Sequence, residues 1–225
     1  NNENMFLYLL QASISIADIY NNLGMPLLAR KYLDESKEYA ESFNNQLILG
    51  RLYYAYAISY EVESNLDIAI ENMEKAKSYF DHLNKNNLMI PCLMSLSYMH
   101  YKNNNLEKAN EYINQSDSIL KSRFFNEEFS LKNDIYKNLN LDKNNIDRNS
   151  IDITFNTIKE KRYVEVFCSI SPKDINCLMN VYKKIGDKEK FKECKSYWDK
   201  CVKVVASNIT DKEQNKSYLK YNLIT

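Results

Sequence analysis

Glycine, proline and net charge are all scarce in this sequence. The 225 residues include three glycines and three prolines, fewer than an all-β fold with many tight turns requires. The 30 Lys and Arg residues balance the 30 Asp and Glu residues, so no overall field draws the chain to nucleic acid or to an anionic membrane. No apolar run approaches the roughly 18 residues that cross a bilayer, and no signal peptide opens the chain. The composition therefore predicts a helical, cytoplasmic protein.

Residues that carry chemistry are also scarce. No Gly-rich phosphate loop and no metal-binding triad is present, so we expect no enzyme activity, no cofactor and no metal. His100 is expected to pack in the structure, and Cys194 and Cys201 are expected in a helix core. The cysteines form no CxxC pair and are odd in number, which predicts reduced thiols. They are Cys92, Cys168, Cys177, Cys194 and Cys201.

A 40-residue period runs through the first half of the chain. Residues 13–40, 53–80 and 93–120 superpose, and Gly24, Asn65 and residues 103–105 break each segment into two helical halves. Each segment is therefore predicted to form a helical hairpin. Four positions recur at constant offsets: a small residue, an aromatic ring, an alanine and a large apolar residue. They are Ala17, Tyr20, Ala29 and Leu33, then Ala57, Tyr60, Ala69 and Met73, then Ser97, His100, Ala109 and Ile113.

The second half of the chain repeats less regularly. Ser171, Pro172 and Asp174 provide an N-cap, a proline at the first helical position and a first-turn carboxylate, which predicts a helix start. Residues 142–150 are predicted to be a loop. The whole chain, residues 1–225, is predicted to be a single repeat domain. Its repeats are expected at 5–43, 46–84, 88–122, 124–162 and 171–206, followed by a C-terminal helix over 207–224.

These small, aromatic and alanine positions resemble the tetratricopeptide pattern. With a unit of 40 residues, residues 50–77, 98–113 and 157–191 are similar to peptide-sensing quorum-sensing regulators of the Rap, NprR, PlcR and PrgX type. The resemblance implies an all-α, right-handed tetratricopeptide-like superhelix of about five hairpins plus a terminal helix. It also implies a homodimer that binds a short signalling peptide on its concave face. DNA would be contacted only through an N-terminal effector domain, which we expect to be absent from this chain.

The first helices of the hairpins should line the concave wall. Asparagine side chains there can bond to the backbone of an extended peptide, and aromatic and methionine side chains can form apolar pockets. Two other interpretations remain open: the asparagines belong to a solvated face, or the apolar residues only pack between hairpins. The candidate peptide-binding residues are Gln11, Ile14, Asp18, Arg51, Tyr54, Ile58, Met94, Tyr98, Lys173, Asn176 and Asn180.

Three functions remain compatible with the sequence. The first is the receptor module of a bacterial quorum-sensing transcriptional regulator that binds a short peptide. The second is a general tetratricopeptide scaffold for protein–protein interaction. The third is the sensing part of a Rap-type response-regulator phosphatase. An apolar, aromatic groove with asparagine favours a small hydrophobic peptide, whereas a wall of one charge would favour a charged tail.

Overall fold

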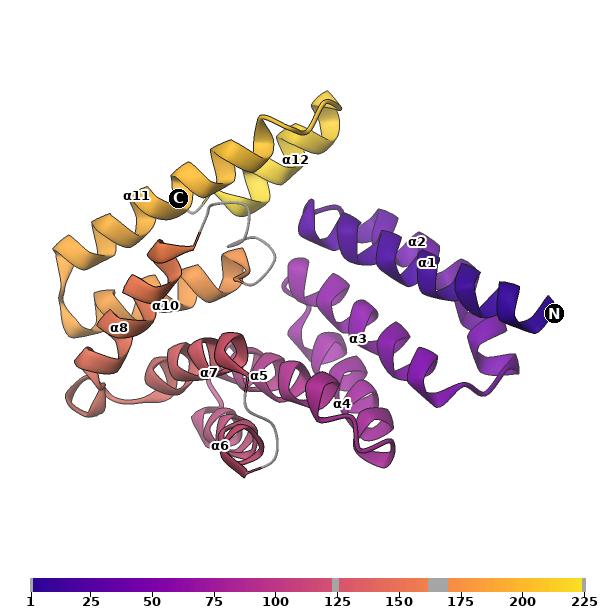
Figure 1. Cartoon of the computed structure of the whole chain (residues 1–225), viewed down its shortest axis with the longest axis horizontal. Coiled ribbons are helices and arrows are strands. Elements are labelled where there is room, and N and C mark those ends of the chain that lie inside the picture. Colours follow the sequence, from indigo (N-terminus) through magenta and orange to yellow (C-terminus); the bar gives the residue numbers. More distant parts are fainter. Residues whose placement is uncertain (1, 123–125, 162–169, 224–225) are drawn as a thin grey trace. The chain divides into compact units, whose positions relative to one another are not determined.

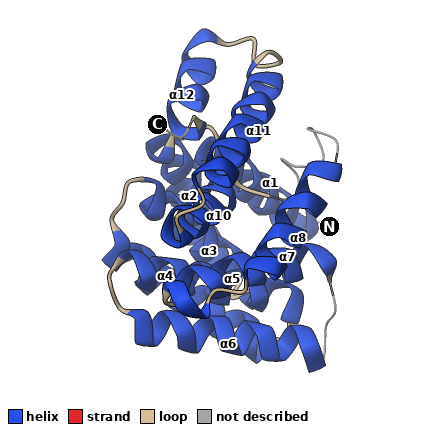
Figure 2. Ribbon diagram, turned by 90° about the vertical axis from the view of Figure 1, so that its left-hand side faces the viewer, coloured by secondary structure: helices blue, strands red, loops and turns tan. Residues whose placement is uncertain are grey.

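The structure is a computed structural model that describes residues 2–122, 126–161 and 170–223 (Figure 1). Within these ranges it contains 11 α-helices, one short 3-10 turn and no strand (Figure 2). The predicted all-α fold class is confirmed. Of the helices in these ranges, none is both long enough and apolar enough to cross a bilayer.

The helices fall into two compact units, residues 1–105 and 106–225. The predicted single domain and its repeat boundaries stay predictions. The first unit contains α1 (Asn2–Asn22), α2 (Pro26–Ser42), α3 (Gln46–Val62), α4 (Leu66–His82) and α5 (Asn86–Lys102). The second contains α6 (Leu106–Ser122), α7 (Glu127–Asn140), η1 (Lys143–Asn145), α8 (Arg148–Glu160), α10 (Pro172–Ile185), α11 (Lys188–Ala206) and α12 (Lys212–Asn222).

The first unit has a strict half-period of 20 residues. Each of α2, α3, α4 and α5 has 17 residues and is followed by a three-residue connection. One residue in every connection has a positive φ, the conformation that ends a helix in a left-handed turn. These residues are Gly24, Asn44, Ser64, Asn84 and Asn104. The predicted breaks at Gly24, Asn65 and residues 103–105 are confirmed, and the turns at Asn44 and Asn84 complete the series.

The recurring aromatic position closes these turns through its carbonyl group. The Met25 N–H donates to the Tyr20 carbonyl at 2.8 Å, and the Asn65 N–H donates to the Tyr60 carbonyl at 2.9 Å. The Asn105 N–H makes the equivalent bond to the His100 carbonyl at 2.8 Å. This bond pairs carbonyl groups that a helix end would otherwise leave unsatisfied. The turn geometry therefore recurs with the sequence period.

The recurring small residues are the contact points between helices. Ala17, Ala29, Ala57 and Ala69 are fully buried, as are the large residues Leu33 and Met73 that follow the alanines. The α3–α4 contact is tight at Gly50 of α3, where an added Cβ would lie 2.6 Å from the Phe80 ring of α4. Burial of each large apolar side chain contributes about 1.5–3 kcal/mol, so this seam holds the unit together.

Polar contacts fix how neighbouring helices of the first unit are aligned. The Tyr56 hydroxyl donates to the Asp34 carboxylate at 2.5 Å and thereby joins α3 to α2. Arg30 pairs with Glu63 at 2.8 Å and lies over the Tyr60 ring, 4.6 Å from its centroid. These bonds link α2 to the end of α3, beyond the apolar seam.

In the second unit, α10 begins where the sequence predicts a helix start. The Ser171 side chain accepts from the Asp174 N–H, and the Asp174 carboxylate accepts from the Ser171 N–H, which forms a capping box. Pro172 occupies the first turn, and Gly186 ends the helix with a φ of 83°. The N-cap prediction is therefore confirmed.

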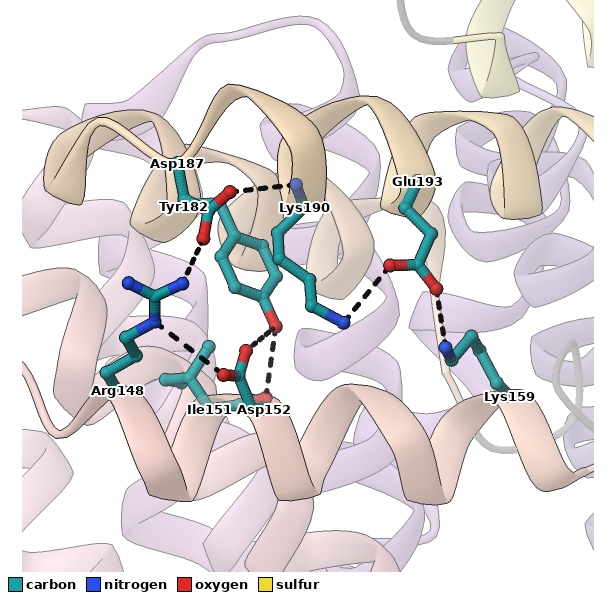
Figure 3. Close-up of polar contacts among 8 residues, drawn as sticks. All are labelled: Arg148, Ile151, Asp152, Lys159, Tyr182, Asp187, Lys190 and Glu193. Atoms are coloured by element: carbon teal, nitrogen blue, oxygen red, sulfur yellow. Dashed lines mark hydrogen bonds and ion pairs between the residues drawn. The ribbon is translucent and has the colours of Figure 1, made fainter.

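Side-chain bridges connect the unequal helices of the second unit. The Lys184 ammonium of α10 donates to the carbonyl groups of Leu139 and Leu141 at the end of α7, at 2.6 and 3.0 Å. The Trp198 indole N–H donates to the Asn222 carbonyl at 2.8 Å and ties α11 to α12. Figure 3 shows the bridges among α8, α10 and α11, made by Arg148, Asp152, Lys159, Tyr182, Asp187 and Glu193.

Two segments differ in extent from their predictions. Helix α8 begins at Arg148, inside the loop predicted over 142–150, because the Asp147 side chain accepts from the Ser150 N–H and caps it. Helix α12 begins at Lys212 and not at 207, because Asp211 caps it through the Gln214 N–H. The apolar residues Ile151, Phe155 and Ile158 of α8 are fully buried.

Candidate functional site

The first unit contains a cavity of about 230 Å³. Four helices line this cavity. Three of them, α1, α3 and α5, are the first helices of the predicted hairpins, and α4 contributes the Phe80 ring. The cavity wall is largely apolar and has one acidic and one basic side chain. The lining residues are Ile14, Asp18, Arg51, Tyr54, Phe80, Leu88 and Pro91.

Helical spacing brings these side chains to one place. Ile14 and Asp18 are four residues apart on α1, and Arg51 and Tyr54 are three apart on α3, so each pair shares a helix face. In the 40-residue register, Pro91 of α5 corresponds to Arg51. From α1 to α3 to α5, the lining residues therefore lie about one helical turn earlier in the repeat each time. The cavity runs diagonally across the three helices.

The two charged groups influence each other across this wall. Desolvation by burial raises the pKa of Asp18 to about 6, and the positive charge of Arg51 lowers it by a smaller amount. At neutral pH, Asp18 is therefore a carboxylate, and Arg51 only partly neutralises its negative charge. A cationic ligand group beside Asp18 would favour its charged form, and Arg51 offers a planar donor to a carboxylate.

Tyr54 is the aromatic member of the wall. Its hydroxyl shares a hydrogen bond with the Ser95 side chain of α5, and desolvation raises the pKa of Tyr54 well above its usual range. The hydroxyl therefore stays protonated at all physiological pH values. Ile14 and Phe80 are almost fully buried and form the apolar floor.

Four of the eleven candidate peptide-binding residues line this cavity: Ile14, Asp18, Arg51 and Tyr54. The other candidates of the first unit lie outside the lining. Gln11, Ile58 and Tyr98 are half-buried, and Met94 is buried with 4% of its surface exposed. Sequence reasoning missed Phe80, Leu88 and Pro91. The repeat register could have found Pro91, because it occupies the position of Gln11 and Arg51.

The remaining candidates belong to the second unit. Lys173, Asn176 and Asn180 are half-buried along α10, at spacings of three and four residues that place them on one helix face. They do not line the second cavity, which has a volume of about 330 Å³ and a charged rim. That cavity is lined by Arg148, Ile185, Gly186, Asp187, Lys188 and Glu189. Peptide contact by the three residues stays a prediction.

The residues that the sequence analysis weighed for chemistry, His100, Cys194 and Cys201, are buried. No cluster of three or more His, Cys, Asp or Glu side chains that could hold a metal occurs among residues 2–122, 126–161 and 170–223. Four cysteines are reduced and buried, and burial raises the pKa of Cys201 to about 11. Cys168 lies outside the described residues. His100 is buried in α5, as predicted, and Cys194 and Cys201 lie in the core of α11.

Comparison with known proteins identifies the fold. No protein-family model and no curated protein matches the sequence. The structure is similar to a crystal structure from Podosopora anserina, named for kinesin light chain and built of nearly identical tetratricopeptide-like repeats. The TM-score is 0.53 at 12% identity, over 90% of this chain and 97% of the other. A single-residue variant of that protein gives a TM-score of 0.53 at 12% identity, over 88% and 95%. The chain therefore has a tetratricopeptide-like repeat fold.

Proposed function

We propose that this chain is a binding module that holds an extended peptide segment against the first unit, with an apolar side chain in the cavity of α1, α3, α4 and α5. The observation that supports this function is the cavity itself. It is apolar except for one carboxylate and one guanidinium, and four residues singled out by their repeat positions line it. Tetratricopeptide-like folds present such concave helix faces to partners.

The expected affinity follows from these groups. One buried apolar anchor contributes about 1.5–3 kcal/mol, and a hydrogen bond to a charged group about 1.5–3 kcal/mol. Several such contacts must exceed an association cost of several kcal/mol. Binding of about 8 kcal/mol, a micromolar Kd, is the scale that this site supports.

The charges indicate which peptide chemistry the cavity selects. Asp18 suits an ammonium group, either a free N-terminus or a lysine, and Arg51 suits a carboxylate. Because the pKa of Asp18 is raised to about 6, a bound cation gains a full negative partner only above that pH. Binding of an amine-bearing peptide should therefore weaken as the pH falls from 7.5 to 5.

Two kinds of ligand fit this proposal. The fold supports a scaffold that captures a segment of a partner protein. The resemblance to peptide-sensing regulators supports a free signalling peptide of about five to eight residues, and thus a quorum-sensing receptor. DNA contact through another domain and the predicted homodimer are not required by either ligand, and both stay predictions here.

The test begins with a synthetic random library of peptides about seven residues long, selected on the 225-residue chain. The Kd of each selected peptide is then measured by calorimetry. Arg51→Ala with Tyr54→Ala should weaken binding at least tenfold, because the anchor and the charged donor are both lost. Ile153→Ser, on the exposed face of α8, is the matched control and should change nothing. Equal binding by the double variant and the control would contradict the proposal.

A second pair of variants asks whether α10 takes part. Asn176→Ala with Asn180→Ala should weaken the same peptides about tenfold if these amides hold peptide backbone, since unpaired peptide groups would remain. Circular dichroism checks that the fold is retained. An unchanged Kd in this variant, together with a loss in the Arg51 and Tyr54 variant, restricts the ligand to the first unit.

Chemical modification of the selected peptide separates the two kinds of ligand. Acetylation of its N-terminus and amidation of its C-terminus remove both terminal charges. If the ligand is a free signalling peptide, the blocked peptide should bind at least tenfold more weakly. If the ligand is an internal segment of a protein, blocking should have little effect.

A further inference from the structure

The two charged side chains of the cavity wall are half-buried but do not pair with each other. Asp18 of α1 and Arg51 of α3 both line the cavity, and the positive charge of Arg51 acts on Asp18. Within the part of the chain that the structure describes, neither side chain forms an ion pair or a hydrogen bond. Removing a charge from water is costly unless the charge gains a partner. Both groups therefore have free capacity to bind a ligand in the cavity.

A cation that binds Asp18 must also be compatible with Arg51. A lysine ammonium has donors and no acceptor, so it would meet Arg51 as a like charge and give the guanidinium nothing to bond to. The first residue of a peptide differs, because its ammonium group and its carbonyl group are attached to the same Cα. It can donate to Asp18 and accept from Arg51 at the same time. The two charges of the wall therefore favour a free peptide N-terminus over a lysine side chain.

The rest of the wall determines which side chain this first residue should carry. Ile14, Phe80, Leu88 and Pro91 give the cavity its apolar surface. Its volume of about 230 Å³ is below the roughly 300–1,000 Å³ of sites for drug-sized ligands, so it accommodates about one side chain. Ile14 lies one helical turn from Asp18, so a side chain on the Cα that carries the ammonium group reaches this surface directly. A large apolar side chain such as that of leucine, isoleucine, methionine or phenylalanine fits best.

We propose that the cavity binds the free N-terminal residue of a peptide, with the ammonium group on Asp18, the carbonyl oxygen on Arg51 and an apolar side chain in the cavity. This inference rests on the proposed function and adds the end of the peptide that is recognised. The peptide leaves the cavity from its second residue onward. An internal segment of a protein has no α-ammonium group, so it cannot satisfy Asp18 in this way.

The first measurement compares two synthetic peptide libraries of the same composition, about seven residues long and amidated at the C-terminus. The peptides of one library have a free N-terminus, and those of the other are acetylated. Selection on the 225-residue chain should enrich large apolar residues at the first position of the free library. The best acetylated peptides should bind about tenfold more weakly or worse. Equal affinities from both libraries, with apolar residues enriched only at internal positions, would overturn the inference.

The Arg51→Ala with Tyr54→Ala variant separates this failure from a failure of the proposed function. If acetylated peptides bind as tightly as free ones and lose affinity in the variant, the cavity is a peptide site that accepts an internal segment. The proposed function then holds, and the inference about the N-terminus is wrong. If no peptide from either library loses affinity in the variant, both are wrong.

The second measurement moves the positive charge of the peptide from its terminus to a side chain. The tightest free peptide is made again in acetylated form with lysine as its first residue. It should bind as weakly as the acetylated parent peptide, because Arg51 repels the lysine ammonium. Recovery of the affinity of the free peptide would overturn the inference in favour of lysine recognition. Displacement of the free peptide by leucine at an equal concentration would overturn it in favour of a free amino acid.

The third measurement removes the negative charge of the wall and keeps its shape. Asp18→Asn should weaken the free peptide about tenfold or more and leave the acetylated peptide within about twofold, because only the free peptide presents a cation. Asp81→Asn, at an exposed position of α4, is the matched control and should leave both affinities unchanged. Circular dichroism checks that both variants are folded. An equal loss for the free and the acetylated peptide in Asp18→Asn would overturn the inference, since Asp18 would then not bind the ammonium group.

Discussion

The two units obtain their helix arrangement by different means. In the first unit, α2, α3, α4 and α5 have 17 residues each, the turns repeat every 20 residues, and each turn is closed by backbone hydrogen bonds. In the second unit, α7, α8, α10, α11 and α12 have 14, 13, 14, 19 and 11 residues. There, side chains such as Lys184 and Trp198 bond to the carbonyl groups of neighbouring helix ends.

This difference shows two ways in which a helical repeat can be specified. Where the sequence keeps its period, turn geometry and small residues place each helix, and polar side chains refine the alignment. Where the period is lost, a few long side chains must hold the helices in place, so fewer residues carry more of the stability. Single substitutions should therefore have their largest effects at seams in the first unit and at bridges in the second.

The largest expected effect is at Gly50, where α3 packs against the Phe80 ring of α4. Gly50→Val should lower the free energy of unfolding by about 3 kcal/mol, because the Cβ would overlap the fully buried Phe80 ring. Urea denaturation measures the loss. Phe80→Leu added to that variant should recover part of it by making space. No recovery would show that the loss arises from something other than this contact.

A bridge of the second unit comes next. Lys184→Met should cost about 2 kcal/mol, because the carbonyl groups of Leu139 and Leu141 lose their shared donor. Lys183→Met is the matched control; its side chain is exposed, and we expect a change below about 0.5 kcal/mol. Equal effects of the two variants in thermal unfolding would contradict the idea that bridges hold this unit.

A stabilising change is expected at the cavity of the first unit. The pKa of Asp18 is raised to about 6 in the folded chain, above the value of 3.8 in the unfolded chain. The folded state therefore binds the proton more tightly, and stability falls as the pH rises from about 4 to 6. Asp18→Asn should stabilise the chain by about 1–2 kcal/mol at pH 7.5, and the gain should vanish near pH 4.

Urea denaturation at both pH values tests this linkage. Glu38→Gln, at an exposed position of α2, should show no pH-dependent gain. If Asp18→Asn destabilises the chain at pH 7.5, the carboxylate is an anchor of the fold and not a group held for a ligand. A gain accompanied by weaker binding of selected peptides would support the ligand role.

The smallest effect is expected at a repeat turn. Ser64 has a φ of 63°, which glycine adopts without strain, so Ser64→Gly should stabilise the first unit by about 0.5 kcal/mol. Ser78→Gly, inside α4, should instead destabilise it by about 0.5–1 kcal/mol. Opposite shifts of the melting temperature confirm the role of the turn, and shifts of the same sign contradict it.

The sequence alone determined the local structure of this protein. The recurring positions of Ala17, Tyr20 and Ala29 predicted the hairpins and their seam, because a helix must bury one face at constant spacing. Gly24 and the Ser171 cap predicted where helices end and begin, because these signals act within a few residues. The starts of α8 and α12 lie outside the repeat period, so the sequence predicted their positions less closely.

Only the tertiary structure decided which side chains meet. The cavity combines Ile14 with Phe80, Leu88 and Pro91, which lie more than 60 residues away in the chain. The diagonal course of the cavity depends on how successive helices cross, and crossing angles depend on all the packed side chains together. The sequence shows that Met5, Leu9 and Ile19 of α1 are apolar, but only the structure shows that they are exposed. Periodicity shows that a helix has an apolar face, and only packing shows whether that face is covered.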